Sequence, residues 1–291
     1  MTSTPANGRS PLAFGTLLTV LSVPFWLAGA AVAGTGPLPM GMPVSAFQFV
    51  LPVTVAAVLV FREEGGAGVR RLMKRTVSVA GTTRRASWAT AVLLVPALLL
   101  VTYGLITLAG RPPSGSHSPL ASIPLLLALY LLAALAEEAG WTGYLLRPVQ
   151  ERYGALGAGL VTGLIWAAWH LVAYVQAGRS APWIAGQVLG SVAVRVLIVR
   201  LVANAGGTVL IAVVVHITIN LAQSLFPGYP EQPAPALLYG LLATLTAAAM
   251  VLGTEPRTLT RTKSRAAHEP PTAAPPATPP PAVRTWRPNG P

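Results

Sequence analysis

Residues 119–146 read PLASIPLLLALYLLAALAEEAGWTGYLL, an apolar run that carries two adjacent acids, Glu137 and Glu138, near its end. The run is long enough to cross a lipid bilayer as a helix. A carboxylate inside hydrocarbon is costly, so acids within a membrane span usually serve a function. The stretch therefore predicts a transmembrane helix that contributes to a functional site.

The composition supports a membrane protein. Hydrophobic residues make up 53% of the 291 positions, the mean hydropathy is +0.60, and only 10% of residues are charged. Soluble domains average about 25% charged residues. The chain has no cysteine, which excludes disulfides, thiolate metal ligands and a cysteine nucleophile. The net charge of +12 comes from basic residues in loops and the tail, without interleaved aromatics, so no nucleic-acid partner is expected.

Apolar stretches near the length of a membrane span recur along the chain. A transmembrane helix needs about 20 residues. Such stretches lie at about 11–33, 43–61, 87–109, 120–146, 155–177, 182–203, 208–226 and 235–253. We therefore predict an all-α fold, a polytopic membrane helical bundle of about eight transmembrane helices over residues 11–253.

Glycines recur at a spacing of four in two of these stretches. Gly159 and Gly163 form one pair, and Gly186 and Gly190 form another. Small residues at this spacing let helices approach closely in a membrane. We interpret both pairs as packing positions.

The distribution of lysine and arginine predicts the orientation. With the N-terminus inside, the outward loops hold only Arg111 and Arg179. The inward segments hold Arg9, Arg62, Arg70, Arg71, Lys74, Arg75, Arg84, Arg85, Arg147, Arg152 and the basic tail. Cytoplasmic loops carry the excess of basic residues. Both termini are therefore predicted to be cytoplasmic, residues 1–10 included. The Ala-, Gly-, Pro- and Arg-rich composition suggests a GC-rich bacterial genome, and hence an integral protein of a bacterial plasma membrane.

Residues 254–291 differ in kind from the bundle. They are rich in proline and basic residues, which is typical of disorder, so a disordered cytoplasmic tail is predicted. Its first basic residues are Arg257, Arg261, Lys263 and Arg265. These side chains either bind anionic membrane lipids or only fix the topology.

Three further polar residues lie inside predicted spans, namely His170, His216 and Asn220. His216 and Asn220 are four residues apart, so they share one helix face. At 1.5 Å rise per residue, Glu138 and His216 lie roughly 12 Å from the cytoplasmic ends of their spans, Asn220 roughly 18 Å and His170 roughly 22 Å. A lone histidine or asparagine in a span more often joins two helices. The whole set, in a chain with eight acids and four histidines, predicts a shared cavity.

Three short patterns in this region occur in a characteristic order. Residues 137–146 read EEAGWTGYLL, Trp166 precedes His170 by four, and His216 precedes Asn220 by four, after the turn-like segment 204–208. Together they resemble the three motifs of the CPBP (CAAX protease and bacteriocin-processing, or Abi) family of intramembrane endopeptidases. The resemblance covers about residues 120–225. It implies a helical membrane fold and peptide hydrolysis inside the membrane.

The residues themselves suggest how such chemistry could work. Peptide hydrolysis needs an activated water, donors for the oxyanion and a proton for the leaving amine. We expect Glu137 to be the general base, His170 to hold and polarise the water, and Glu138 to support them. His216 and Asn220 can donate N–H groups to the oxyanion. The resemblance implies the same roles, those of a glutamic-type endopeptidase.

A zinc-dependent mechanism would use the same atoms. Glu137, His170 and His216 are a plausible catalytic zinc set that leaves one position open for water. The three ligands would come from separate helices, however, with no His-Glu-x-x-His helix to present them. No cofactor is our first expectation, and a zinc-dependent metalloendopeptidase is the alternative.

One departure from the family pattern concerns the first motif. The family carries arginine where this chain has Thr142. Without a cation, two adjacent buried carboxylates resist ionising together. Arg195 lies roughly 12 Å from the cytoplasmic end of its span, the depth of Glu138, so we hypothesise that it faces the glutamates.

The expected substrate is a peptide or lipidated peptide that reaches the site from the cytoplasmic half of the membrane. Two rival functions are open. Thr142 leaves room for a non-catalytic relative that acts as a membrane immunity or binding protein. A proton-coupled transporter could use the same acids and histidines as a relay, although no inverted repeat is visible.

Overall fold

The computed structural model describes residues 9–32, 38–79 and 85–253. The predicted tail at 254–291 and most of the predicted N-terminal segment 1–10 lie outside these residues. Their disorder and cytoplasmic location stay predictions.

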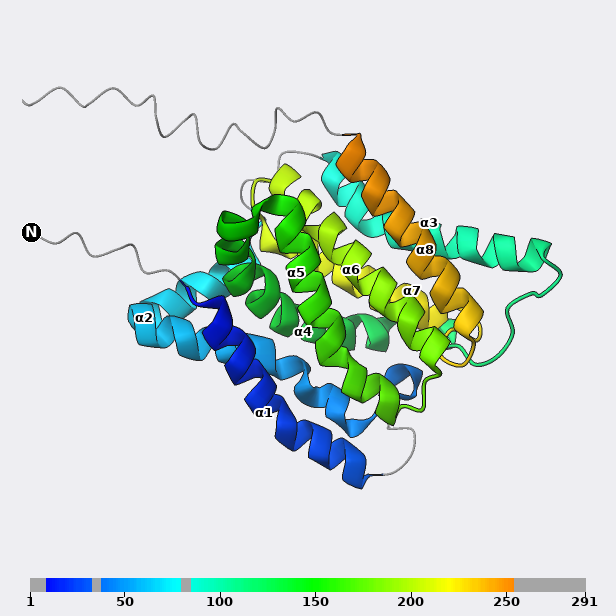
Figure 1. Cartoon of the computed structure of the whole chain (residues 1–291), viewed down its shortest axis with the longest axis horizontal. Coiled ribbons are helices and arrows are strands. Elements are labelled where there is room, and N and C mark those ends of the chain that lie inside the picture. The colour runs from blue at the N-terminus through cyan, green and yellow to red at the C-terminus, as the bar shows by residue number, and fades with distance from the viewer. Residues whose placement is uncertain (1–8, 33–37, 80–84, 254–291) are drawn as a thin grey trace, which may run out of the picture. The chain divides into compact units, whose positions relative to one another are not determined.

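The described chain is helical throughout, and no strand is found in it. Eight α-helices follow one another (Figure 1), and each overlaps one of the apolar stretches predicted from the sequence, although the first part of the stretch 43–61 forms η2 and not α2. They are α1 (Pro11–Ala31), α2 (Leu51–Thr76), α3 (Arg85–Leu108), α4 (Ile123–Gly140), α5 (Leu146–Gln176), α6 (Ala181–Asn204), α7 (Val209–Leu225) and α8 (Pro233–Leu252). Short elements are η1 (Pro39–Gly41), η2 (Val44–Val50), η3 (Leu120–Ser122) and the π-helical turn η4 (Trp141–Leu145). The predicted polytopic helical bundle is confirmed.

The lengths of these helices suit a membrane. Within the described residues, six helical stretches are long and apolar enough to cross a bilayer. The longest, Leu120–Gln176, contains both α4 and α5, and α7 is a shorter apolar helix of 17 residues. The chain is therefore an integral membrane protein.

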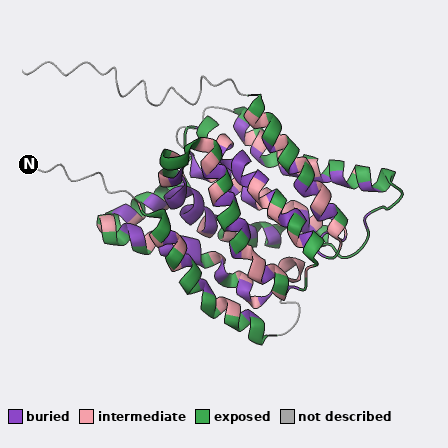
Figure 2. Ribbon diagram, viewed as in Figure 1, coloured by how far each residue is buried: buried purple, intermediate pink, exposed green. Residues whose placement is uncertain are grey.

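Apolar side chains cover the outside of the bundle as well as its core. Leu12, Leu108 and Leu252 are each at least 80% exposed. Figure 2 shows buried and exposed positions on the same helices, as expected when one face packs and the other meets lipid. α6 is the most enclosed span, with 61% of its apolar window buried, compared with 22% for α1. This central position explains how α6 can supply groups to an internal site.

Glycines let α6 approach its neighbours closely. A Cβ atom on Gly163 of α5 would lie 2.9 Å from Cα of Val192. A Cβ atom on Gly186 of α6 would lie 2.4 Å from the carbonyl carbon of Ala236 in α8. Real Cβ contacts are not this short, so only glycine fits. The predicted packing role of the glycine pairs is confirmed at these positions.

One end of the bundle, which we name the basic end, joins the start of α1, the second half of α2 and η4. α2 bends at Gly65, whose φ of +65° favours glycine. Arg9 Nη1 donates to the carbonyl of Gly143 at 2.9 Å, and the Tyr144 hydroxyl donates to Glu63 at 3.4 Å. These contacts place the N-terminal side of α1 beside the end of α4.

The opposite end, which we name the loop end, joins the segments 38–50, 109–119, 177–180 and 226–232. Arg179 donates to the carbonyls of Met40 and Pro230. Backbone hydrogen bonds from Ser118 to Ser224 (2.8 Å) and from Gly228 to Ser116 (2.9 Å) tie the segment 109–119 to the end of α7 and to the segment 226–232.

We expect Gly186→Ala to lower the free energy of unfolding by about 1–3 kcal/mol, because the added methyl group overpacks the contact between α6 and α8. Thermal unfolding in detergent micelles measures this. Gly104→Ala in α3 is the matched control, since a Cβ atom there meets nothing within 4 Å. Equal stability of the two variants would show that the close contact between α6 and α8 at Gly186 does not contribute to stability.

Candidate active site

The two adjacent glutamates lie near the end of α4 and are buried, with 5% of Glu137 and none of Glu138 exposed. At Trp141 the helix widens into the π-helical turn η4. The N–H of Trp141 donates to the carbonyls of both glutamates. π-Helical turns are frequent at functional sites. This π-helical turn lies directly after the two glutamates and connects α4 to α5.

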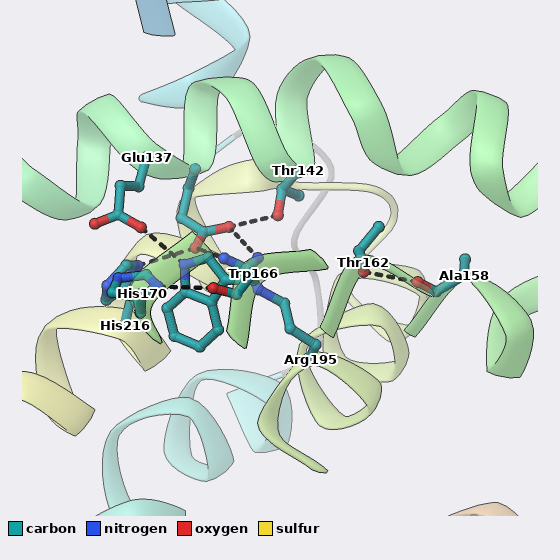
Figure 3. A network of polar contacts seen from close by, with 9 residues as sticks. Glu137, Thr142, Ala158, Thr162, Trp166, His170, Arg195 and His216 are labelled. Atoms are coloured by element: carbon teal, nitrogen blue, oxygen red, sulfur yellow. Dashed lines mark hydrogen bonds and ion pairs between the residues drawn. The ribbon is translucent and has the colours of Figure 1, made fainter. Parts of the chain in front are cut away.

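Glu138 is bound by a cation from α6. Arg195 Nη1 donates to Oε2 and Nη2 to Oε1, both at 2.8 Å, and both side chains are almost fully buried (Figure 3). Such bidentate pairs are the strong form of an ion pair. Thr142 adds a hydrogen bond from its hydroxyl to Oε2 at 2.6 Å. The hypothesis that Arg195 faces the glutamates is confirmed.

Arg195 is held in place by aromatic rings. Its Cζ lies 4.4 Å from the ring centroid of Trp166 and 5.9 Å from that of Trp141. An arginine over an indole face gains cation–π attraction, and more so where water is excluded. Gly163 leaves room for it, because a Cβ atom there would lie 3.1 Å from Cβ of Arg195. The absence of a side chain at Gly163 on α5 therefore makes the space that Arg195 on α6 occupies.

Both histidines are oriented through Nδ1. His216 Nδ1 lies 3.0 Å from Glu138 Oε1, and His170 Nδ1 lies 2.8 Å from the carbonyl oxygen of Trp166. An ionised carboxylate and a carbonyl can only accept, so Nδ1 is the donor in both rings. Each ring therefore keeps Nε2 for another partner. The ring of Trp166 contacts both imidazoles edge-on, with centroid distances of 5.0 Å to His170 and 5.3 Å to His216.

Glu137 has different surroundings from its neighbour. Its Oε2 accepts a hydrogen bond from Trp166 Nε1 at 2.9 Å, and no basic side chain of the described residues lies within ion-pair distance. Sequence reasoning found Trp166 as part of a motif but missed this donor role. The spacing of Trp166 one helical turn before His170 was the available signal.

A cavity of about 220 Å³ lies beside these groups. Glu137, His170, His216 and Asn220 line it, whereas Glu138 and Arg195 do not. In the part of the chain that the structure describes, the Asn220 amide makes no hydrogen bond, so its donors remain available to a bound molecule. The structure thus brings all five predicted site residues together and places Glu138 behind the cavity wall.

A second polar cluster in the cavity wall was not predicted. Tyr229 donates to Gln187 Oε1 at 2.9 Å, and Gln223 Nε2 donates to the Tyr229 oxygen at 2.9 Å. Gln187 and Gln223 also line the cavity. Gln223 lies seven residues after His216, on the face that His216 and Asn220 share, so helical spacing could have identified it.

The geometry also bears on the zinc alternative. In residues 9–32, 38–79 and 85–253, no three His, Cys, Asp or Glu side chains are grouped so that they could hold a metal ion. In this arrangement Glu137, His170 and His216 line one cavity without forming a ligand set.

Comparison with known proteins gives the site a context. Residues 119–222, from α4 to most of α7, match the family model of the Rce1-like proteins, described as type II CAAX prenyl endopeptidase Rce1-like. The CPBP-family resemblance is confirmed. A CAAX prenyl protease 2 of Methanococcus maripaludis is 28% identical over 143 residues, which are 46% of this chain and 52% of that protein. The chain spans about half the length of this curated relative.

The role of Arg195 can be tested by moving the cation. Arg195→Met leaves Glu138 buried without its partner, and breaking such a pair costs about 3–5 kcal/mol. We expect a lower melting temperature, partly restored in the double variant Arg195→Met/Thr142→Arg, because the new arginine can reach Glu138 from the Thr142 position. Thermal unfolding in detergent checks this.

The control is Arg147→Met, since the Arg147 side chain is 79% exposed and, among the described residues, forms its ion pair with the exposed Glu151. A single variant as stable as the wild type, or a double variant no better than the single one, would contradict the proposed role of charge.

Proposed function

We propose that this chain is a glutamic-type intramembrane endopeptidase that hydrolyses a peptide bond with a water activated by Glu137. The observation that carries the proposal is that the two adjacent acids have different surroundings. Glu138 is held by Arg195 outside the cavity, whereas Glu137 lines the cavity with only an indole N–H on one oxygen. One carboxylate is therefore available to accept a proton.

In the proposed reaction a water lies between the free oxygen of Glu137 and Nε2 of His170. Glu137 takes a proton as the water oxygen attacks the substrate carbonyl carbon, and a tetrahedral intermediate with one negative oxygen forms. The C–N bond then breaks, and the proton passes from Glu137 to the leaving amine. The water oxygen ends in the new carboxyl group, so atoms and charge balance.

The oxyanion needs donors that face the cavity. The Asn220 amide supplies N–H groups without losing another hydrogen bond. For His216 to donate through Nε2, its ring must carry both protons, because Nδ1 already donates to Glu138. An imidazolium there would balance the second negative charge of the site, since Arg195 balances only one. We therefore assign the oxyanion to Asn220 and a protonated His216.

The departure at Thr142 was the reason to consider a non-catalytic relative. Arg195 supplies the cation that Thr142 lacks, and Thr142 still donates to Glu138. This arrangement supports the catalytic proposal over an immunity or binding protein.

The proposed substrate is a peptide or lipidated peptide. The cavity wall is largely apolar and aromatic, with Leu129, Leu132, Trp183 and Tyr174 among its residues, so it suits a hydrophobic side chain or a lipid group. The name of the archaeal relative refers to prenylated substrates. A prenylated peptide is accordingly the first lipidated probe to use.

We expect Glu137→Gln to reduce cleavage by purified protein about 10²–10⁴-fold, the usual contribution of a general base. The glutamine oxygen can still accept from Trp166, so the melting temperature should stay near that of the wild type. The assay is cleavage of a quenched fluorescent peptide library, with and without a prenyl group, in detergent.

Glu151→Gln is the control, because Glu151 is exposed on α5. Adding a chelator should leave the wild-type rate unchanged. Loss of activity on chelation would favour the zinc mechanism, and full activity of Glu137→Gln would assign the base to another group.

We expect Asn220→Ala to lower kcat about 10²–10³-fold with little change in KM, because an oxyanion donor acts in the transition state. Ser191→Ala, which removes another polar side chain of the cavity wall, is the matched control. Steady-state kinetics with the best library peptide separates the two constants. A change confined to KM would instead indicate that Asn220 binds the ground state.

A further inference from the structure

The cavity wall contains a cation that the proposed hydrolysis does not use. Arg179 follows the end of α5 and lines the same cavity as Glu137 and His170. Among the described residues, no carboxylate lies within ion-pair distance of its guanidinium. Burial lowers the pKa of this guanidinium, and the charge of Glu231, which lies beyond ion-pair distance, raises the pKa by less. An anion in the cavity would therefore supply the close counter-charge that Arg179 lacks.

The guanidinium of Arg179 is fixed by three contacts and keeps unused donors. Nη1 donates to the carbonyl of Pro230 and Nη2 to that of Met40, and Cζ lies 5.4 Å from the ring centroid of Trp183. An arginine side chain has five N–H groups. Within the described part of the chain, the two hydrogen bonds leave three of these groups without a partner, among them the buried Nε–H. Unpaired donors on a planar cation suit a carboxylate, which can accept two hydrogen bonds from arginine.

Tyr174 adds a further donor beside Arg179. The backbone N–H of Arg179 donates to the Tyr174 carbonyl at 3.0 Å, and the Tyr174 ring lies 5.1 Å from the ring of Trp183, which Arg179 also contacts. Tyr174 lines the cavity, and its hydroxyl makes no hydrogen bond in the parts of the chain that the structure describes. The Tyr174 ring stacks on that of His170, with centroids 5.8 Å apart. An unpaired hydroxyl and an unpaired cation thus follow His170 toward the loop end.

The position of Arg179 determines which part of a substrate it can reach. From His170 to the end of α5 at Gln176, the helix rises roughly 9 Å. Arg179 comes shortly after this end. An extended peptide spans about 3.3–3.6 Å per residue, so a group bound by Arg179 lies about two to four residues from a bond held at His170.

We propose that Arg179, together with the Tyr174 hydroxyl, binds a carboxylate of the substrate about two to four residues from the scissile bond. The carboxylate is either the C-terminus of the peptide or an acidic side chain, since both present the same two oxygens. Arg179 is then a specificity residue that selects and aligns the peptide and takes no part in bond cleavage. The inference rests on the proposed peptidase function and adds to it the charge of the substrate.

Two pairs of peptides, built around a bond that the quenched library identifies, test the proposal and separate the two sources. In the first pair the scissile bond lies about three residues before the end, and the C-terminus is a free acid or an amide. In the second pair the C-terminus is a distant amide, and a residue about two to four positions from the scissile bond, on either side, is Glu or Gln. We expect kcat/KM to be about 10–100-fold higher for the acid in one pair, the usual effect of a hydrogen bond to a charged group. A preference in the first pair assigns the terminus, and one in the second pair assigns the side chain.

Substitution of Arg179 then tests the residue itself. Arg179→Gln should bring the acid-to-amide ratio close to one, whereas Arg179→Lys, which keeps the charge but not the planar fork, should keep part of the ratio. The ratio compares two substrates on one sample, so a smaller folded fraction leaves it unchanged. Arg111→Gln is the matched control and should keep the wild-type ratio, because Arg111 is an exposed arginine of the loop end that does not line the cavity. Equal rates within both pairs for the wild type, or an unchanged ratio in Arg179→Gln, would overturn the proposal.

A binding measurement separates this inference from the peptidase proposal. If purified protein cleaves nothing, the peptidase proposal fails, and fluorescence anisotropy of labelled acid and amide peptides in detergent still tests the role of Arg179. Tighter binding of the acid, lost in Arg179→Gln, supports the carboxylate site. Equal binding of acid and amide, or no binding of either, overturns it.

Discussion

The buried ion pair between Glu138 and Arg195 is the interaction on which the site depends. Removing two charges from water is costly, and their attraction compensates only when the remaining hydrogen-bonding positions are filled. Here Thr142 and His216 donate to the same carboxylate, so its oxygens accept four hydrogen bonds in all. Because the partners come from α4, η4, α6 and α7, the pair fixes these elements at one depth.

This pair also explains why two identical neighbours do different work. Consecutive residues on a helix point about 100° apart, so Glu137 and Glu138 cannot face the same surroundings. Glu138 points toward α6, where Arg195 neutralises it, whereas Glu137 lines the cavity and accepts a hydrogen bond from Trp166. A single acid could not both anchor the helices and accept a proton. The tandem separates the structural task from the chemical one.

Much of this arrangement could be predicted from the sequence, because a membrane limits the possibilities. Helix length fixes the spans, and the depth along each span brought Glu138, His216 and Arg195 to a common level. Side-chain direction around the helix axis could not be predicted in the same way. The bond from Trp166 to Glu137 depends on a rotamer, and the contact of Gln187 with Tyr229 depends on how α6 meets a loop.

The replacement of the motif arginine by Thr142 shows what a motif does and does not require. In the family pattern the cation comes from the helix that bears the acids. In this chain it comes from α6, at the same depth, and the freed position keeps a hydroxyl that still donates to Glu138. Electrostatics constrains the charge and its distance from the carboxylate, not the helix that supplies it. A sequence pattern that demands arginine at position 142 would reject this chain. The physical requirement, a positive charge beside Glu138, is nevertheless fulfilled by Arg195. Arg195 could take this role because Gly163 lets α5 and α6 approach and Trp166 covers the guanidinium, so the three residues form one compensating set.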